Sequence, residues 1–389
     1  MTTKRFIKKP VLLALILILV VGAIYYIESQ KPDIQDITQP STQENQLTEQ
    51  SPTPTTEKNA PRVSLNAELK KARYKQAPDF RGIEHWINTE PLTINDLKGK
   101  VVLVDFWTYS CINCIRTLPY ITQWDEKYRD DGLVIVGVHT PEFKFEEKTE
   151  NVQEALTKYN IKYPIAQDND YGTWRAYENR YWPHKFLIDA DGYIRYDHIG
   201  EGGYEETEKT IQLLLKERME ALGKNEEIDQ EITAPGTVTS VDFSKTLTPE
   251  IYLGRMTSRG HFGNDEGLGD QPRVYTLPKL TQPNTVYIQG SWRANPEYLE
   301  LIGDEGIIQL TYSAKSVNIV AEAELEKESR IEVNLNGNKD TSGNDVKDGS
   351  ILIKEPRLYN VVQTKDYETN TIQLHVKGKR FRIYTFTFG

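Results

Sequence analysis

Cysteine is scarce in this chain: only Cys111 and Cys114 occur in 389 residues. A zinc site would need two more Cys or His ligands at suitable spacing, whereas the histidines are scattered singly. A structural disulfide across a two-residue spacer would be strained and would close almost no loop, so it would contribute little stability. The pair is therefore predicted to be a redox-active Cys-x-x-Cys dithiol.

Other absences narrow the function. The sequence has no Gly-rich phosphate loop, no Cys-x-x-Cys-His haem attachment and no metal-ligand cluster. We therefore expect no metal and no cofactor besides the redox-active disulfide Cys111–Cys114. The formal net charge of −10 argues against nucleic acid or anionic lipid as the main partner. Electrons are then expected to come from another protein.

Aromatic residues are missing from residues 28–73, where Pro, Thr, Gln, Ser and Glu dominate. Because such a segment has little apolar surface to bury, it is predicted to be a disordered linker. A flexible chain of this length has a root-mean-square reach of roughly 40 Å. The linker would let the following domains sample a volume above a membrane.

Charge is missing from residues 10–27, an apolar stretch preceded by four Lys and Arg residues and followed by acidic ones. As a helix it would span about 27 Å, enough to cross the hydrocarbon core of a bilayer. The charge asymmetry predicts a single-pass anchor, with residues 1–9 as a cytoplasmic tail and the body outside. A cleaved signal peptide with its small residues at Val21-Gly22-Ala23 is the alternative, although the apolar run continues to Ile27.

A β-rich run, Val101–Trp107, leads directly into the cysteines, and the segment that begins at Cys111 has helical apolar spacing. Cys111 should therefore lie in the first turn of a helix. Unpaired amide groups and the positive end of the helix dipole favour a thiolate there. Cys111 is the predicted attacking sulfur, and Cys114, one turn deeper, is placed to resolve a mixed disulfide.

The run from Val102 to Tyr120, with Asp105-Phe-Trp-Thr-Tyr-Ser-Cys111-Ile-Asn-Cys114 at its centre, resembles the active-site segment of the thioredoxin superfamily. The likeness is to the extracytoplasmic TlpA/ResA/DipZ type, above all to the soluble C-terminal part of the DipZ type, and it extends from about Ala77 to Gly389. It implies an α/β thioredoxin fold and thiol–disulfide exchange at a bacterial cell membrane.

Roles follow from this resemblance residue by residue. Asp105 takes the position of the buried acid that exchanges a proton with the resolving cysteine, and burial should raise its pKa. Pro183 matches a cis-proline that faces the dithiol beside the substrate chain, with the bulky Trp182 before it. Trp107 matches an aromatic residue that packs beside the site, although a core role accounts for it equally well. His184 could titrate near the dithiol, or could be a polar edge residue.

Two departures leave the direction of electron flow open. ResA-like proteins carry a glutamate three residues after the second cysteine, where this chain has Thr117. The dipeptide between the cysteines, which influences redox poise, is Ile112-Asn113. The resemblance itself implies the reducing direction, with disulfide-containing extracytoplasmic proteins as substrates and a CcdA/DsbD-like membrane donor acting in trans.

The pattern divides the body into two domains. Residues 74–226 alternate in the α/β manner: a strand at 133–138, a helix at 152–159, strands at 185–188 and 193–199, and a helix at 207–222. Residues 234–389 contain at least seven short strands, which predict a jelly-roll β-sandwich resembling carbohydrate-binding modules. Trp292, Tyr298 and Tyr312 could stack on a glycan or could belong to the core.

The sequence thus predicts a membrane-anchored thiol–disulfide oxidoreductase. Two alternatives stay open. Thr108 stands three residues before Cys111, as in a thiol peroxidase, but the upstream proline of such sites is replaced by Val104. The chain could also be a glycan-binding or partner-binding protein on a thioredoxin scaffold.

Overall fold

The computed structural model describes residues 69–236, 241–324 and 328–389. Its contacts divide the chain into Met1–Asn59 and Ala60–Gly389, and every described residue belongs to the second unit. The predicted tail, anchor and most of the linker lie outside the described residues. Within those residues, no helix combines the length and apolarity needed to span a membrane.

The end of the predicted linker is ordered, which corrects the boundary at residue 73. Residues 69–73 are helical. The Lys70 ammonium lies 3.1 Å from the Asp189 carboxylate and 2.5 Å from that of Asp191. Leu, Lys, Ala and Arg favour helix, and these ion pairs attach the turn to the folded domain.

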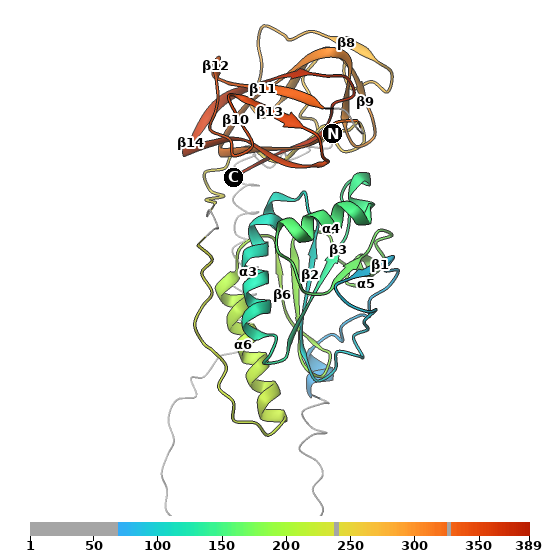
Figure 1. The fold of residues 1–389 in the computed structure, drawn as a ribbon, viewed down its shortest axis with the longest axis vertical. Helices are drawn as coiled ribbons and strands as arrows, with labels where there is room; N and C mark the ends of the chain where they lie inside the picture. Colours follow the sequence, from blue (N-terminus) through green and yellow to red (C-terminus); the bar gives the residue numbers. More distant parts are fainter. Residues whose placement is uncertain (1–68, 237–240, 325–327) are drawn as a thin grey trace, which may run out of the picture. The chain divides into compact units, whose positions relative to one another are not determined.

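The N-terminal domain contains one mixed six-stranded sheet, with the strands in the order β1-β4-β3-β2-β5-β6 (Figure 1). Strands β2, β3 and β4 are parallel to one another, and the remaining pairs are antiparallel. The elements are β1 (His85–Ile87), β2 (Val101–Trp107), α3 (Ile112–Tyr128), β3 (Leu133–His139), the 3₁₀ turn η1 (Lys144–Glu147), α4 (Thr149–Lys158), β4 (Ile165–Gln167), α5 (Gly172–Ala176), β5 (His184–Ile188), β6 (Ile194–Ile199) and α6 (Tyr204–Ala221).

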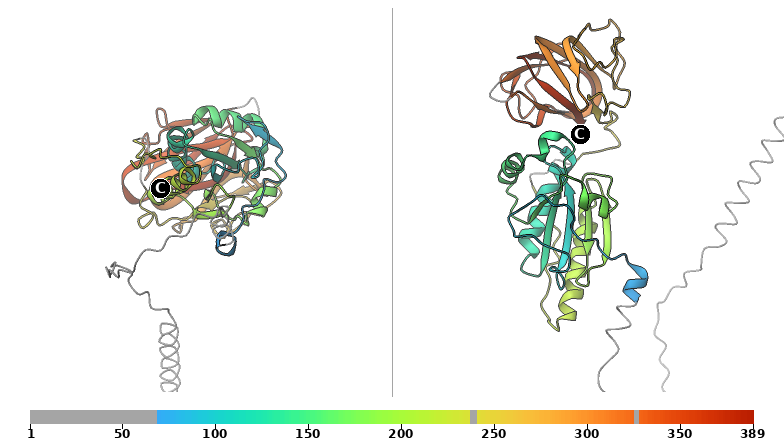
Figure 2. Two further views of the ribbon diagram at one scale, coloured as in Figure 1. Left: turned by 90° about the horizontal axis from the view of Figure 1, so that it is seen from below. Right: turned by 90° about the vertical axis from the view of Figure 1, so that its right-hand side faces the viewer.

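Strand β2 separates two apolar cores because successive side chains of a strand point to opposite faces. Leu103 and Trp107 pack with apolar residues of α3, α4 and α6. Val104 and Phe106 pack on the other face with residues of α5 and β5. Figures 1 and 2 show α6 running beside α3 over the sheet. The alternation assigns Asp105 to the face that α3 covers.

The predicted elements of this domain are present with small shifts at their ends. The last helix begins at Tyr204 instead of residue 207, because Gly203 adopts a left-handed φ of 60° directly before it. The helix expected at 152–159 begins at Thr149. Strand β1 was not predicted, since three residues are too few to show a period.

The C-terminal domain is entirely β, as predicted. Among the described residues its strands are β7 (Ile251–Tyr252), β8 (Arg273–Tyr275), β9 (Val286–Ala294), β10 (Leu299–Glu322), β11 (Ser329–Leu335), β12 (Asn338–Lys339), β13 (Ser350–Ile353), β14 (Arg357–Lys377) and β15 (Arg382–Phe388). They form one antiparallel hydrogen-bonded network of nine strands, and not the two separate sheets that a sandwich implies.

Two long strands explain that difference. Residues expected to form separate short strands are joined in β10, which pairs with β14 along most of its length. Register shifts between Ala314 and Ser316 and between Val317 and Asn318 interrupt the ladder. Such irregularities bend a strand, so one strand can serve both halves of a folded sheet.

The aromatic residues considered for glycan stacking belong mainly to the core of this domain. Trp292 and Tyr312 are fully buried. Tyr298 is half-buried, and the Arg382 guanidinium lies 5.0 Å from its ring centroid. These side chains therefore do not form an exposed sugar platform.

Candidate active site

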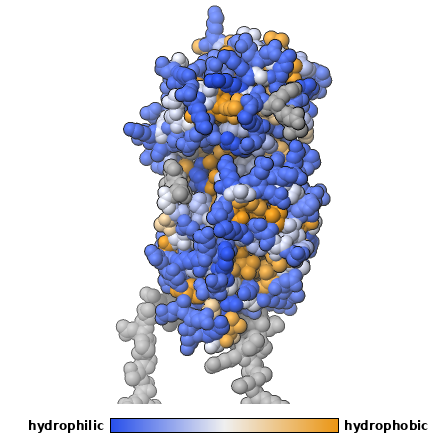
Figure 3. Space-filling model, viewed as in Figure 1, coloured by the Kyte–Doolittle hydropathy of each residue, from blue (hydrophilic) through white to orange (hydrophobic). Residues whose placement is uncertain are grey.

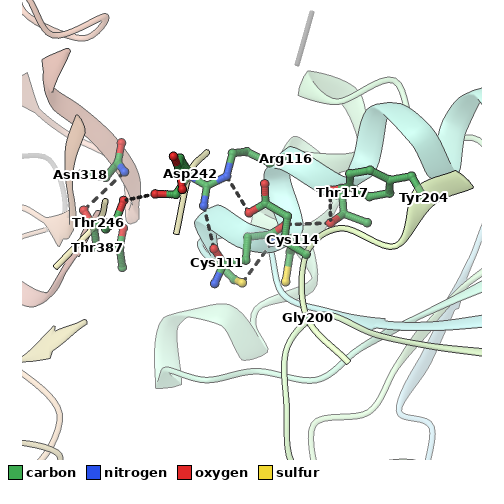
Figure 4. Close-up of polar contacts among 12 residues, drawn as sticks. Cys111, Cys114, Arg116, Thr117, Gly200, Tyr204, Asp242, Thr246, Asn318 and Thr387 are labelled. Atoms are coloured by element: carbon green, nitrogen blue, oxygen red, sulfur yellow. Dashed lines mark hydrogen bonds and ion pairs between the residues drawn. The ribbon is translucent and has the colours of Figure 1, made fainter. Parts of the chain in front are cut away.

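The two cysteines stand at the junction of β2 and α3, as the sequence predicts (Figure 4). Cys111 is the N-cap of α3, and its Sγ accepts a hydrogen bond of 3.2 Å from the backbone N–H of Cys114. An amide donor and the helix N-terminus both favour negative charge on that sulfur. Cys111 is partly exposed, Cys114 is buried, and both are free thiols.

Cys114 faces the sheet above Asp105. Burial raises the pKa of the Cys114 thiol, and the neighbouring Cys111 and Asp105 raise it further. Asp105 is 1% exposed, and its Oδ1 has no hydrogen-bond partner among the described residues. Burial raises the pKa of Asp105 to about 7, although the Lys185 ammonium opposes the shift. A carboxyl group with such a pKa can accept and return a proton near neutral pH.

Lys185 is a site residue that the sequence analysis missed. It is the direct cross-strand neighbour of Asp105 in the pairing of β2 with β5. Its side chain is fully buried, and Nζ donates a hydrogen bond of 3.1 Å to the backbone oxygen of Gly200. Burial lowers the pKa of Lys185, while Asp105 and Cys114 oppose that shift. The interaction between Asp105 and Lys185 therefore influences the protonation state of the Asp105 carboxyl group beneath the Cys114 thiol.

His184 does not lie at the dithiol, which corrects the suggestion that it modulates the site. It is buried, with Nδ1 2.8 Å from Asn179 Oδ1 and Nε2 3.0 Å from Asp197 Oδ2. Burial lowers its pKa. Neighbouring side chains of β5 point to opposite faces, so the residue that faces the site is Lys185.

Trp107 has the core role, the second of the two that its position allowed, and is not available to contact substrate. Its side chain is 0% exposed and packs edge-on against His139, with ring centroids 5.2 Å apart. Burial lowers the pKa of His139 to about 3, so this imidazole is neutral. Both rings are part of the core beneath the site.

The Trp182–Pro183 peptide bond is cis, as the resemblance implies. The Trp182 indole N–H donates a 3.0 Å hydrogen bond to the backbone oxygen of Thr140, and its ring lies 4.2 Å from that of Trp174. Trp182 and Cys111 line the same hollow of about 70 Å³. These contacts fix the position of the Trp182 side chain beside the attacking sulfur of Cys111.

A cluster of acidic side chains also lines this hollow, and it brings Glu142 together with Glu250 and Tyr252 of the C-terminal domain. The Tyr252 hydroxyl donates a 2.6 Å hydrogen bond to the Glu142 carboxylate and lies 3.3 Å from that of Glu250. Burial raises the pKa of Glu142 to about 8, and Glu146 and Glu250 add to the shift. Sequence spacing could not bring this acid cluster together, because Glu142 is more than 100 residues from Glu250 and Tyr252.

Glu146 stabilises the loop before the cysteines through hydrogen bonds. Its buried carboxylate accepts a 2.6 Å hydrogen bond from the Ser110 hydroxyl and a 3.0 Å bond from the Phe143 amide. Among the described residues, no group of three or more His, Cys, Asp and Glu side chains is placed to hold a metal ion.

Comparison with known proteins agrees with this geometry. The AhpC/TSA family model matches residues 74–197, and the model described as thioredoxin like C-terminal domain matches residues 248–389. ResA of Bacillus cereus, named a thiol-disulfide oxidoreductase, is 30% identical over 138 residues, which are 36% of this chain and 76% of ResA. This chain belongs to the thioredoxin-like family that includes ResA.

Within this family, the likeness to DipZ extends across both domains. DipZ of Mycobacterium bovis is 34% identical over 319 residues, which are 80% of this chain. The chain matches only 43% of the length of DipZ. A solution structure of an oxidised thioredoxin-like protein is 30% identical, covers 37% of this chain and 97% of its own, and has a TM-score of 0.35.

Proposed function

We propose that this chain is a thiol–disulfide oxidoreductase that exchanges its Cys111–Cys114 pair with disulfides of other proteins. The observation that carries the proposal is the pairing of a partly exposed N-cap sulfur with a buried thiol above an acid of pKa about 7. An exposed nucleophile and a buried resolving group are what two-step disulfide exchange requires.

The first step is attack by the Cys111 thiolate on one sulfur of a substrate disulfide. A Cys111–substrate disulfide forms, the substrate disulfide breaks, and the second substrate sulfur leaves as a thiolate that takes up a proton. The Trp182 side chain lies beside the new bond, because it lines the same hollow as Cys111.

In the second step Asp105 accepts the Cys114 proton, and the Cys114 thiolate attacks Cys111 Sγ. The Cys111–Cys114 disulfide forms and the substrate leaves as a second thiolate. Two electrons have then passed from the dithiol to the substrate. Lys185 stabilises the Asp105 carboxylate before this step, when the acid must be ionised.

We further propose that the chain works in the reducing direction outside the cytoplasm of a bacterial cell, anchored in the membrane by residues 10–27. A dithiol in a CcdA/DsbD-like membrane protein would return two electrons to the Cys111–Cys114 disulfide. The apolar N-terminal stretch and the likeness to DipZ support this arrangement.

The decisive experiment is the reduction potential of the Cys111–Cys114 couple, measured on the full chain by equilibration with dithiothreitol or glutathione. We expect a value near that of thioredoxin, about −270 mV, which suits a reductase. A value near about −120 mV would reverse the direction to that of an oxidase. A pair that forms no reversible disulfide would exclude the proposed activity.

A thiol peroxidase is the second candidate, because the AhpC/TSA family model matches this domain. The residue that suggested it, Thr108, is fully buried, and its hydroxyl lies 3.4 Å from His139 Nε2. Direct turnover of hydrogen peroxide distinguishes the two functions, and we expect none above the rate of a free thiol.

A further inference from the structure

A cleft of about 420 Å³ begins at Ile112, the residue that follows the attacking cysteine. One wall is the first half of α3, including Ile115 and Pro119. Residues of β10 and β14, among them Asn318 and Leu358, form the opposite wall. Ile112 also lines the smaller hollow that contains Cys111, so the cleft and the reactive sulfur adjoin.

The charged side chains around this cleft are mainly basic, in a chain whose net charge is −10. The acidic side chain on the lining is Asp345, and the backbone oxygen of Gly389 accepts hydrogen bonds from the backbone N–H groups of Lys315 and Ser316. The basic side chains on the lining are Arg116, Lys158, Lys315 and Arg357. A local excess of positive charge attracts anionic ligands.

The two arginines already have partners. The Arg116 guanidinium lies 2.8 Å from the Glu201 carboxylate, and both side chains are nearly buried. The Arg357 guanidinium lies 2.9 Å from the Asp345 carboxylate. These pairs fix the walls of the cleft and leave the arginines little capacity to recruit a further anion.

The two lysines have no ion pair among the described residues. Partial burial and the nearby Arg357 guanidinium lower the pKa of Lys158. Lys158 also lines an adjoining hollow of about 170 Å³ that extends to Tyr109, so it stands where two openings meet. Lys315 lies across the cleft on β10. Two unpaired ammonium groups facing one opening can each donate hydrogen bonds to a carboxylate.

Apolar surface does not mark a comparable site. Figure 3 shows a mostly hydrophilic face with separate apolar patches. Among the described residues, the large hydrophobic side chains with the highest exposure, Leu280, Met256 and Val274, do not line the cleft. Single exposed apolar side chains are ordinary on a folded surface. The charge of the cleft is the better guide to what binds near the dithiol.

We propose that this cleft binds an acidic stretch of the substrate polypeptide, with Asp or Glu side chains next to the cysteine to be exchanged paired to Lys158 and Lys315. The proposal rests on the oxidoreductase function and specifies its substrate class. Apolar side chains of the cleft wall, such as Ile115 and Leu358, contact the aliphatic parts of the bound segment. The substrate cysteine is thereby delivered to Cys111.

The test uses the full chain with Cys114→Ser, which stops the reaction at the Cys111 mixed disulfide. Three peptide disulfides of one sequence carry two Glu, two Gln or two Lys residues beside the reactive cysteine. The rate constant for mixed-disulfide formation is measured at low salt for each peptide. We expect the Glu peptide to react about tenfold faster than the Lys peptide, since each exposed ion pair contributes modestly.

Charge reversal provides the matched comparison. Lys158→Glu combined with Lys315→Glu should invert the order of the peptides, and Lys158→Gln alone should reduce the preference. Lys209→Glu, an exposed lysine of α6 away from the cleft, should leave it unchanged. Thermal unfolding of each variant confirms that the fold persists.

The outcomes separate the two proposals. If no peptide and no small neutral disulfide reacts with Cys111, the oxidoreductase function itself is wrong. If all three peptides react at one rate, the function stands and the acidic-substrate inference fails. A preference that survives charge reversal, or a cleft that binds an anionic oligosaccharide without distinguishing the peptides, also overturns the inference.

Discussion

Cys111 and Cys114 are one helical turn apart, yet they face opposite surroundings. Cys114 is sealed against β2 and β5, where Asp105 and Lys185 form a buried pair. Cys111 opens to a hollow lined by Trp182 and by acids from two domains. On the buried side, the reaction depends on transfer of the Cys114 proton to Asp105. On the open side, it depends on which substrate can reach Cys111. Mutations on the two sides should therefore have different signatures.

The largest difference should come from the cysteines themselves. Cys111→Ser should lower disulfide exchange by at least about a thousandfold, since no other thiol on the chain is exposed. The Cys114→Ser variant should still attack a peptide disulfide through Cys111. It should then accumulate a mixed disulfide, which mass spectrometry can detect. Continued turnover of the Cys114→Ser variant would show that the buried thiol is not the resolving group.

Asp105→Asn tests the buried side. With a pKa of about 7, Asp105 is protonated below that pH and can accept the Cys114 proton only above it. The resolving rate should rise through pH 7 in the natural chain and lose this dependence in the variant, with a fall of about a hundredfold at pH 8. Stopped-flow measurement from pH 5 to 9 checks this.

Asp125→Asn is the matched control for that prediction. Asp125 is a buried carboxylate of α3 that pairs with Arg129 and lies away from the dithiol. The pH profile of this control should keep its midpoint near 7. An unchanged profile in Asp105→Asn would move the proton acceptor elsewhere.

Lys185→Met should shift the pH dependence of the resolving step without abolishing that step. Removing the ammonium group takes away the interaction that lowers the pKa of Asp105. The pKa should rise by about one unit, so the midpoint of the resolving rate moves to higher pH and the rate at pH 7 falls several-fold. Lys209→Met, an exposed lysine, is the control. A midpoint that stays in place would mean that the two side chains are not coupled.

The smallest effect is expected on the open side. Glu142, with a pKa of about 8, becomes negative at higher pH beside the hollow that contains Cys111. Negative charge there repels an anionic reagent, so Glu142→Gln should speed alkylation of Cys111 by iodoacetate above pH 8 by about threefold in a Cys114→Ser background. Tyr252→Phe, which removes the hydroxyl bonded to Glu142, should alter the same pH range. Equal rates from pH 7 to 9 would remove Glu142 from the site.

Much of the buried side could be predicted from local sequence. A β-rich run ends just before Cys-x-x-Cys, and this arrangement predicts an attacking first sulfur and a deeper second one, whereas the buried acid at Asp105 was implied by the resemblance. The two-residue period of a strand did not show which residue of β5 lies next to Asp105. It could not separate His184 from Lys185, because the choice of face depends on the register between β2 and β5.

The resemblance to thioredoxin-type sites implied the cis bond before Pro183, whereas the sequence by itself determined the dithiol, its place at a strand-to-helix junction, and the α/β domain followed by an all-β domain. These features arise from residues close together in the chain, where spacing and residue type are sufficient. Only the tertiary structure decided that Lys185 faces Asp105, that Tyr252 bonds Glu142, and that unpaired lysines line the cleft beside Ile112. Contacts between residues distant in sequence depend on strand register and packing, which no local pattern records.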